Sequence, residues 1–177
     1  MMTKDPVGWL KIVRDGASVK RMHTVKTIGE HTVGEHSFGV ALLVLIITEG
    51  GASSNLIKAA LLHDLAEQHT GDLPAPVKWN NPVFHSELTE IERIFEERFG
   101  LHVNISEGDR VVLKWADLLD LTYYCLDQYE MGNRKVVGVL QKAIEALRGL
   151  PHNRIGEDLL DNAVREFRVI GRKGNGE

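Results

Sequence analysis

The sequence has few of the features that define several large classes of protein. Its single cysteine among 177 residues, Cys125, excludes a disulfide framework and favours a reducing, intracellular compartment. The longest apolar run, residues 38–47, is too short to span a bilayer, and residues 1–6 contain no apolar signal core. A net charge of -4 gives no strongly basic field for nucleic acid. We therefore expect a cytoplasmic protein that binds neither membranes nor nucleic acid.

The residues that are present favour one all-α domain. Hydrophobic residues make up 43% and charged residues 26%, which is an ordinary soluble composition, and the length is enough for one sizeable core. Apolar residues recur with helical spacing, and no convincing strand run is found. The sequence predicts a single compact helical bundle of about six to seven helices over residues 1–171. A flexible tail is expected over residues 172–177.

Capping residues and glycines set the expected helix boundaries. A short helix should begin after Asp5 and end near Gly16, burying Val7, Leu10 and Val13. Residues 18–31 have no clear period and should form a loop. Further helices are predicted over residues 33–49, 55–68, 82–99, 107–131, 134–148 and 156–170.

The stretch from residue 61 to residue 67 places polar ligand-type side chains inside an apolar run. In a helix, His63, Asp64 and Glu67 would share one face, with Glu67 one turn beyond the other two. Burying an imidazole and a carboxylate is costly unless both are satisfied. A divalent metal ion is one suitable partner for both. The alternative is a salt-bridged His–Asp pair on a helix surface.

Two further ligand-type residues lie on apolar helical stripes. A lone core-facing histidine such as His36 is usually just hydrogen-bonded, and a carboxylate such as Asp117 must be paired or bind a cation. Asp120 is either an exposed neighbour of Asp117 or a group that hydrogen-bonds a metal ligand and orients it. Together with His63 and Asp64, two imidazoles and two carboxylates suit a divalent cation such as Mn, Fe, Co, Ni or Zn.

These motifs resemble the HD-domain metal-dependent phosphohydrolase superfamily, whose pattern is H…HD…D. Within it, the chain is similar to the small branch of 5′-deoxynucleotidases and phage dATP triphosphohydrolases. The resemblance spans roughly residues 20–128 and implies an all-α HD domain. It rests on the motifs Glu35-His36-Ser37, His63-Asp64-x-x-Glu67, Thr70-Gly71-Asp72-Leu73-Pro74-x-Pro76-Val77-Lys78 and Lys114-x-Ala116-Asp117.

The resemblance implies a metal centre and the groups that act beside it. The ion, which could be Zn, Co, Mn, Ni or Mg, would be held by His36, His63, Asp64 and Asp117. Asp64 is implied to be catalytic as well as a ligand. Glu67 matches an acid that handles protons near the scissile phosphate, where a second ion is also possible.

The resemblance also implies the substrate contacts. Arg21 matches a catalytic arginine that binds phosphate, and Asp72 matches a residue near the deoxyribose. Met22 stands where close relatives often have tryptophan, so the sugar and base contacts differ at this position. Lys78 is either a further phosphate contact or a solvated surface residue.

The expected function is a metal-dependent phosphohydrolase of deoxyribonucleotides. Lys20, Lys26 and Lys78 offer more positive charge beside Arg21 than one phosphate needs, and short phage-type relatives point the same way. Both favour a dNTP triphosphohydrolase that cleaves dATP to deoxynucleoside and triphosphate. The alternative is a dNMP 5′-deoxynucleotidase that releases phosphate, and a different class is a non-catalytic nucleotide-binding HD sensor. The partner would be a small-molecule deoxynucleotide, and the protein a homo-oligomer, a dimer or higher, in the host cytoplasm if phage-encoded.

Overall fold

Helices make up the regular secondary structure of the part of the chain that is described. The structure is a computed structural model that describes residues 5–73, 77 and 81–173. Seven of the helices in this part have nine or more residues, and an isolated bridge between Lys20 and Thr32 is its only β-type pairing. The predicted all-α fold and helix number are confirmed. The elements are α1 Pro6–Ala17, α2 Val33–Ile47, α3 Ser54–Leu62, α4 Glu67–Thr70, α6 Pro82–Phe99, α7 Glu107–Glu130, the 3-10 turn η1 Arg134–Val136, α8 Val137–Arg148 and α9 Arg154–Lys173.

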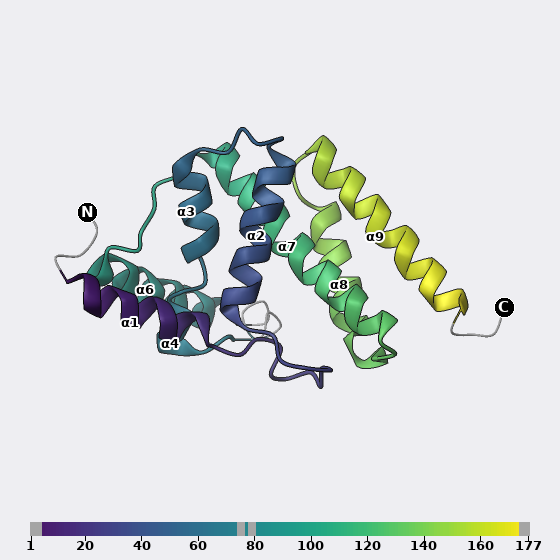
Figure 1. The fold of residues 1–177 in the computed structure, drawn as a ribbon, viewed down its shortest axis with the longest axis horizontal. Coiled ribbons are helices and arrows are strands. Elements are labelled where there is room, and N and C mark those ends of the chain that lie inside the picture. Colours follow the sequence, from purple (N-terminus) through teal and green to yellow (C-terminus); the bar gives the residue numbers. More distant parts are fainter. Residues whose placement is uncertain (1–4, 74–76, 78–80, 174–177) are drawn as a thin grey trace.

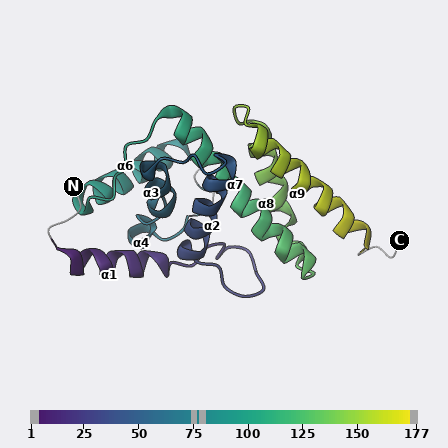
Figure 2. The same cartoon turned by 45° about the horizontal axis from the view of Figure 1, so that its top comes forward.

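Helices α2 and α7 form the centre of the molecule (Figure 1). Helices α1, α3, α4 and α6 lie to one side of this pair, and α8 and α9 lie to the other, as the turned view confirms (Figure 2). The main core is built from apolar residues of α2, α3, α7, α8 and α9, and a smaller cluster joins the turn before α4 to α6 and α1. No described helix is both long enough and apolar enough to cross a membrane.

Side-chain caps fix the starts of the helices that carry the site. The Thr32 hydroxyl accepts a hydrogen bond from the Glu35 amide at 3.3 Å, and the Glu35 carboxylate accepts one from the Thr32 amide at 2.8 Å. This reciprocal capping box begins α2. Ser53 caps α3 and Ser106 caps α7 more simply: each serine hydroxyl accepts a hydrogen bond from one backbone amide. The predicted starts of these helices are close to those observed.

The first helix packs on a different face from the one expected. The prediction that α1 buries Val7 and Leu10 is wrong, because their side chains are 76% and 56% exposed. Instead Trp9, Ile12 and Val13 pack against the small cluster beside α4. The large ring of Trp9 gains more from burial than either of the exposed side chains, so it sets the rotation of the helix.

The predicted continuous helix over residues 55–68 is also wrong. Helix α3 ends at Leu62, residues 63–66 form turns, and α4 begins at Glu67. The break allows Leu65 and the residue after it to enter the small cluster, whereas Leu56 and Ala60 of α3 lie in the main core. At the other end of the chain, α9 continues to Lys173, past the predicted start of a tail at residue 172; residues 174–177 lie outside the described residues.

A glycine allows α9 to lie directly on the core tryptophan. A Cβ atom at Gly156 would lie 2.7 Å from Cε3 of Trp115, a rigid ring that is itself buried and hydrogen-bonded to the Pro151 carbonyl. We expect Gly156→Ala to lower the free energy of unfolding by about 1–3 kcal/mol because the ring must shift. Thermal unfolding should show a fall in Tm of about 2–4 °C for each kcal/mol lost.

The matched control is Gly138→Ala in α8, where an added Cβ would meet no atom within 4 Å. Alanine is the better helix former, so this variant should be as stable as the parent protein or more stable. Equal Tm values for the two variants would contradict the proposed contact between α9 and Trp115.

Candidate active site

Ligand-type side chains from three parts of the fold meet beside the start of α2. His36 lies in the first turn of α2 and is 0% exposed, whereas His63 and Asp64 lie in the turn after α3. The His36 Nε2 atom is 3.3 Å from the His63 Nε2 atom and 3.5 Å from the Asp64 carboxylate. Asp117 reaches the same nitrogen of His36 from α7, at 3.3 Å. The structure therefore brings together the four residues that the motifs singled out.

The outer nitrogens of both imidazoles are already engaged. His36 Nδ1 lies 2.7 Å from the Asp120 carboxylate, and His63 Nδ1 lies 2.9 Å from the Ala60 carbonyl oxygen. Both partners are acceptors, so in the neutral rings the proton belongs on Nδ1. Each Nε2 atom then presents a lone pair to the centre of the cluster.

The resulting donor set fits one divalent metal ion. The His36, His63 and Asp64 donor atoms all lie within 4.8 Å of one another, and Asp117 joins them through His36. Two lone pairs and two carboxylate oxygens facing one another repel unless a positive charge lies between them. The contacts of 3.3–3.5 Å between these atoms agree with the spacing of about 3.3 Å expected for ligands around a tetrahedral ion. The cluster can therefore hold a divalent metal ion.

The pKa values show the same demand for positive charge. Burial opposes protonation of His63, but the adjacent Asp64 carboxylate outweighs it and raises the pKa of His63 to about 9. Burial likewise opposes ionisation of Asp64, yet His63 and Arg21 hold the pKa of this carboxyl well below its usual range. The pKa of His36 is raised despite its burial, because its protonated ring can donate hydrogen bonds to both Asp117 and Asp120. A proton or a metal ion would each satisfy this cluster.

Arg21 lies against the acidic side of the cluster. Its guanidinium Nη1 hydrogen-bonds the Asp64 carboxylate and lies 3.6 Å from the Glu67 carboxylate. Arg21 is largely buried, which opposes its charge, but Asp64 and Glu67 raise its pKa above the usual value. Glu67 is the buried first residue of α4. The predicted phosphate-binding and proton-handling residues therefore lie beside the predicted ligands.

The loop that carries Arg21 is held at its base and at its tip. The Arg21 amide donates to the His31 carbonyl at 2.8 Å, which closes the base of the loop. At the tip, the side-chain amide of Gln128 in α7 accepts from the Ile28 amide at 2.7 Å and donates to the Ile28 carbonyl at 2.8 Å. Both backbone groups of Ile28 are thus hydrogen-bonded to one side chain of α7. These two bonds hold the tip of the loop in place although the loop contains no helix or strand.

The two predicted sugar contacts touch each other. The Met22 amide donates to the Asp72 carboxylate at 3.0 Å, and Met22 adopts a positive φ of 58°. A left-handed backbone is unusual for a residue with a side chain as large as methionine. In this conformation the Met22 amide makes its hydrogen bond to Asp72. Asp72 thus links the loop after α4 to the loop of Arg21. Lys78 lies outside the described residues.

The comparisons with known proteins agree on one family. A family model described as "5'-deoxynucleotidase YfbR-like" matches residues 8–163. The chain belongs to this family. A 5′-deoxynucleotidase of Vibrio vulnificus is 29% identical over 140 residues, which cover 66% of this chain and 72% of the relative. A 5′-deoxynucleotidase of Yersinia pestis (strain Pestoides F) is 27% identical over 142 residues, covering 67% and 72%.

Solved structures show the same fold at lower identity. An HD phosphohydrolase of cyanophage S-2L bound to dA and one catalytic Zn²⁺ ion has a TM-score of 0.62 at 21% identity, over 97% of this chain and 99% of that one. An HD-domain phosphohydrolase from Listeria innocua has a TM-score of 0.67 at 20% identity, over 94% and 98%. A Pyrococcus furiosus protein described as conserved and hypothetical has a TM-score of 0.67 at 20% identity, over 90% and 99%.

These findings confirm the predicted HD-domain resemblance and indicate a metal-dependent phosphohydrolase. The finer prediction, that the substrate is dATP and the product triphosphate, is not confirmed. The family description fits the alternative, a 5′-deoxynucleotidase, better than the favoured dATP triphosphohydrolase.

The assignment of Asp64 as a metal ligand can be tested by metal content. Asp64→Asn removes a charged ligand, so we expect purified protein to hold much less divalent metal than the parent after equal loading. Loss of metal should also lower Tm of the parent protein, because Asp64 and Asp117 then lie close together without a cation. Asp158→Asn, on the exposed side of α9, is the matched control and should keep its metal. Equal metal content in both variants would remove Asp64 from the ligand set.

Proposed function

We propose that this chain is a divalent-metal-dependent 5′-deoxynucleotidase that hydrolyses deoxynucleoside 5′-monophosphates to deoxynucleoside and phosphate. One observation carries the proposal: the Arg21 guanidinium lies beside the His/Asp cluster, held there by Asp64 and near Glu67. A site for one ion with one adjacent guanidinium suits one phosphate group. The match to the YfbR-like 5′-deoxynucleotidase family supports the deoxynucleotide as substrate.

His36, His63, Asp64 and Asp117 would hold the ion. When bound, a divalent ion supplies Lewis acidity toward a phosphate oxygen and lowers the pKa of a water molecule. The two imidazoles contribute neutral nitrogen ligands because Asp120 and the Ala60 carbonyl keep their protons on Nδ1.

Arg21 and Glu67 would perform the remaining chemistry. Arg21 would bind the non-bridging phosphoryl oxygens, whose negative charge grows as the attacking water approaches phosphorus. The bond from phosphorus to the 5′ oxygen then breaks, and that oxygen must gain a proton. Glu67 would accept the proton from the water and pass it to the leaving oxygen. Its position 3.6 Å from Arg21 places this carboxylate close to the bound phosphate.

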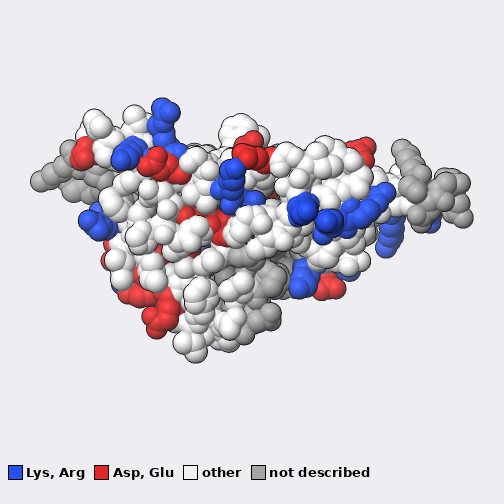
Figure 3. Space-filling model, turned by 90° about the horizontal axis from the view of Figure 1, so that it is seen from below, with Lys and Arg blue, Asp and Glu red and all other residues white. Residues whose placement is uncertain are grey.

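Among the described residues, two basic side chains that could serve a larger anion at the site are already paired with carboxylates. Lys20, which suggested a larger anion, is 63% exposed and paired with Glu30. The Lys114 ammonium group donates a hydrogen bond to the Asp117 carboxylate, with 2.7 Å between nitrogen and oxygen. In the view of Figure 3, Lys and Arg gather at the end formed by α8 and α9. There Arg148, Arg165 and Arg168 line a surface cavity of about 590 Å³ together with acidic residues.

The preference for deoxyribose is assigned to Asp72 and Met22. One oxygen of Asp72 accepts from the Met22 amide, so the second oxygen is the one that would accept from a 3′-hydroxyl. Met22 would then lie beside the sugar, where close packing against the 2′ carbon would exclude ribose.

Two further expectations, that the protein forms a homo-oligomer and that it does not bind nucleic acid, stay predictions.

A substrate screen tests this assignment. We expect the metal-loaded protein to release phosphate from dAMP and other deoxynucleoside monophosphates, with much slower release from AMP. Inorganic triphosphate produced from dATP would instead support the triphosphohydrolase. Equal rates with AMP and dAMP would remove the deoxyribose assignment. Binding of deoxynucleotide without hydrolysis of any substrate would support a nucleotide sensor.

Removal of Arg21 tests the phosphate contact. Arg21→Ala should lower kcat/KM for dAMP by about 10- to 100-fold, because a charge-assisted hydrogen bond contributes about 1.5–3 kcal/mol. Metal content should stay at or above that of the parent, since a positive charge next to Asp64 and Glu67 is lost. Arg14→Ala, at the exposed end of α1, is the control and should leave kcat/KM unchanged. Parent-like kinetics in Arg21→Ala would contradict the role of this residue.

A further inference from the structure

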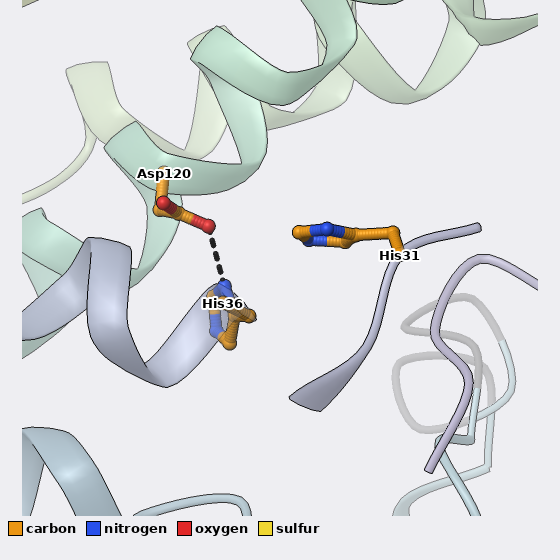
Figure 4. Close-up of side chains that lie close together, drawn as sticks. All are labelled: His31, His36 and Asp120. Carbon is orange, nitrogen blue, oxygen red and sulfur yellow. Dashed lines mark hydrogen bonds and ion pairs between the residues drawn. The ribbon is translucent and has the colours of Figure 1, made fainter. Parts of the chain in front are cut away.

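A carboxylate lies directly behind the most buried residue of the metal cluster. Asp120, on α7, accepts a hydrogen bond from His36 Nδ1 at 2.7 Å (Figure 4), whereas the other residues of the metal cluster face Nε2 of the same ring. The second imidazole has a weaker partner, since His63 Nδ1 bonds the neutral Ala60 carbonyl. The two histidines of the cluster are therefore supported unequally. A charged acceptor makes the opposite nitrogen of the ring a stronger metal ligand than a neutral acceptor does.

The space for this carboxylate comes from a glycine on the facing helix. A Cβ atom at Gly39, one turn after His36 in α2, would lie 1.9 Å from Asp120 Oδ1 and 3.0 Å from its Cγ. Any side chain at position 39 would thus push the carboxylate away. Glycine inside a helix costs about 0.5–1 kcal/mol relative to alanine, so its presence here requires a separate reason. Close packing against Asp120 is that reason.

The ring of His31 lies beside the same contact on the loop side and stacks on Tyr124 of α7. His31 is largely buried, stacks on Tyr124 with ring centroids 4.0 Å apart, and points towards Asp120 and His36 (Figure 4). A donor atom of His31 lies within 4.8 Å of donor atoms on both of those residues. The Asp120 side chain is 17% exposed and that of His36 is fully buried, so the contact lies largely out of water. A hydrogen bond to a carboxylate is stronger where water cannot compete for it.

We propose that Asp120 is a positioning residue that fixes the His36 ring and strengthens its Nε2 atom as a metal ligand, and that Gly39 serves to admit it. This inference rests on the proposed metal site. Neither residue touches the substrate or the ion. Groups that support a ligand in this way typically change metal affinity by about 10–100-fold when they are removed.

The test measures metal binding without substrate. Full-length metal-free protein is titrated with Co²⁺, and its visible absorption gives both the Kd and a signature of the ligand set. Asp120→Asn keeps the shape but removes the charge, so Kd should rise by about 10–100-fold with an altered spectrum. Gly39→Ala keeps every ionisable group and displaces the carboxylate, so it should act in the same direction. The double variant should bind no more weakly than Asp120→Asn, because both changes act through one contact.

Two control variants separate this role from general effects of charge and helix composition. Asp127→Asn removes an exposed carboxylate two turns further along α7, and Gly138→Ala changes a helical glycine with open space around it. Both should keep the parent Kd and spectrum. Thermal unfolding of the metal-free variants checks that each is folded; if Asp120→Asn is not, Gly39→Ala provides the test.

Specific outcomes would overturn the inference. A parent-like Kd in Asp120→Asn would show that the carboxylate does not support the ligand. Weakening in Gly39→Ala that adds fully to that of Asp120→Asn would show that the glycine acts elsewhere. Failure of the proposed function gives a different pattern: the parent protein would bind Co²⁺ with the predicted variant effects but would not release phosphate from deoxynucleotides.

Discussion

The burial of His36 between two carboxylates is the constraint on which the rest of the site depends. Asp120 holds the proton on one ring nitrogen, so the other nitrogen faces Asp117 and the His63–Asp64 pair as a lone pair. Such an arrangement is costly inside a protein unless a positive charge joins it. Helices α2 and α7 form the centre of the fold, and a cation at their junction would offset the cost of this cluster.

The remaining residues of the site come from less regular parts of the chain. The turn after α3 supplies His63 and Asp64, and the interruption between α3 and α4 places Glu67 beside them. The loop of Arg21 has no helix, yet the bidentate contact of Gln128 with Ile28 fixes it to α7. Helices α2 and α7 thus carry His36 and Asp117, the turn after α3 carries the other two proposed ligands, and the anchored loops carry groups that would contact phosphate and sugar. An enzyme needs both sets at fixed positions for efficient chemistry.

The sequence predicted the features that depend on local patterns. Thr32 and Glu35 gave the start of α2, and the apolar neighbours of Asp117 on its own helix indicated that this carboxylate faces the interior. Contacts between distant segments were not accessible in this way. The break at His63 follows from the packing of Leu65 in a separate cluster, and the exposure of Val7 follows from the competing burial of Trp9. The two open alternatives for Asp120 could be separated only by its contact with His36, 84 residues earlier in the chain.

We infer that one divalent ion binds among His36, His63, Asp64 and Asp117. Anomalous diffraction from crystals of the Co²⁺-loaded protein would locate this ion. We expect a single strong peak in contact with Nε2 of both histidines and with a carboxylate oxygen of Asp64 and of Asp117. A peak on the opposite side of the His36 ring, between His31 and Asp120, would contradict it, because that position requires His36 to bind through Nδ1.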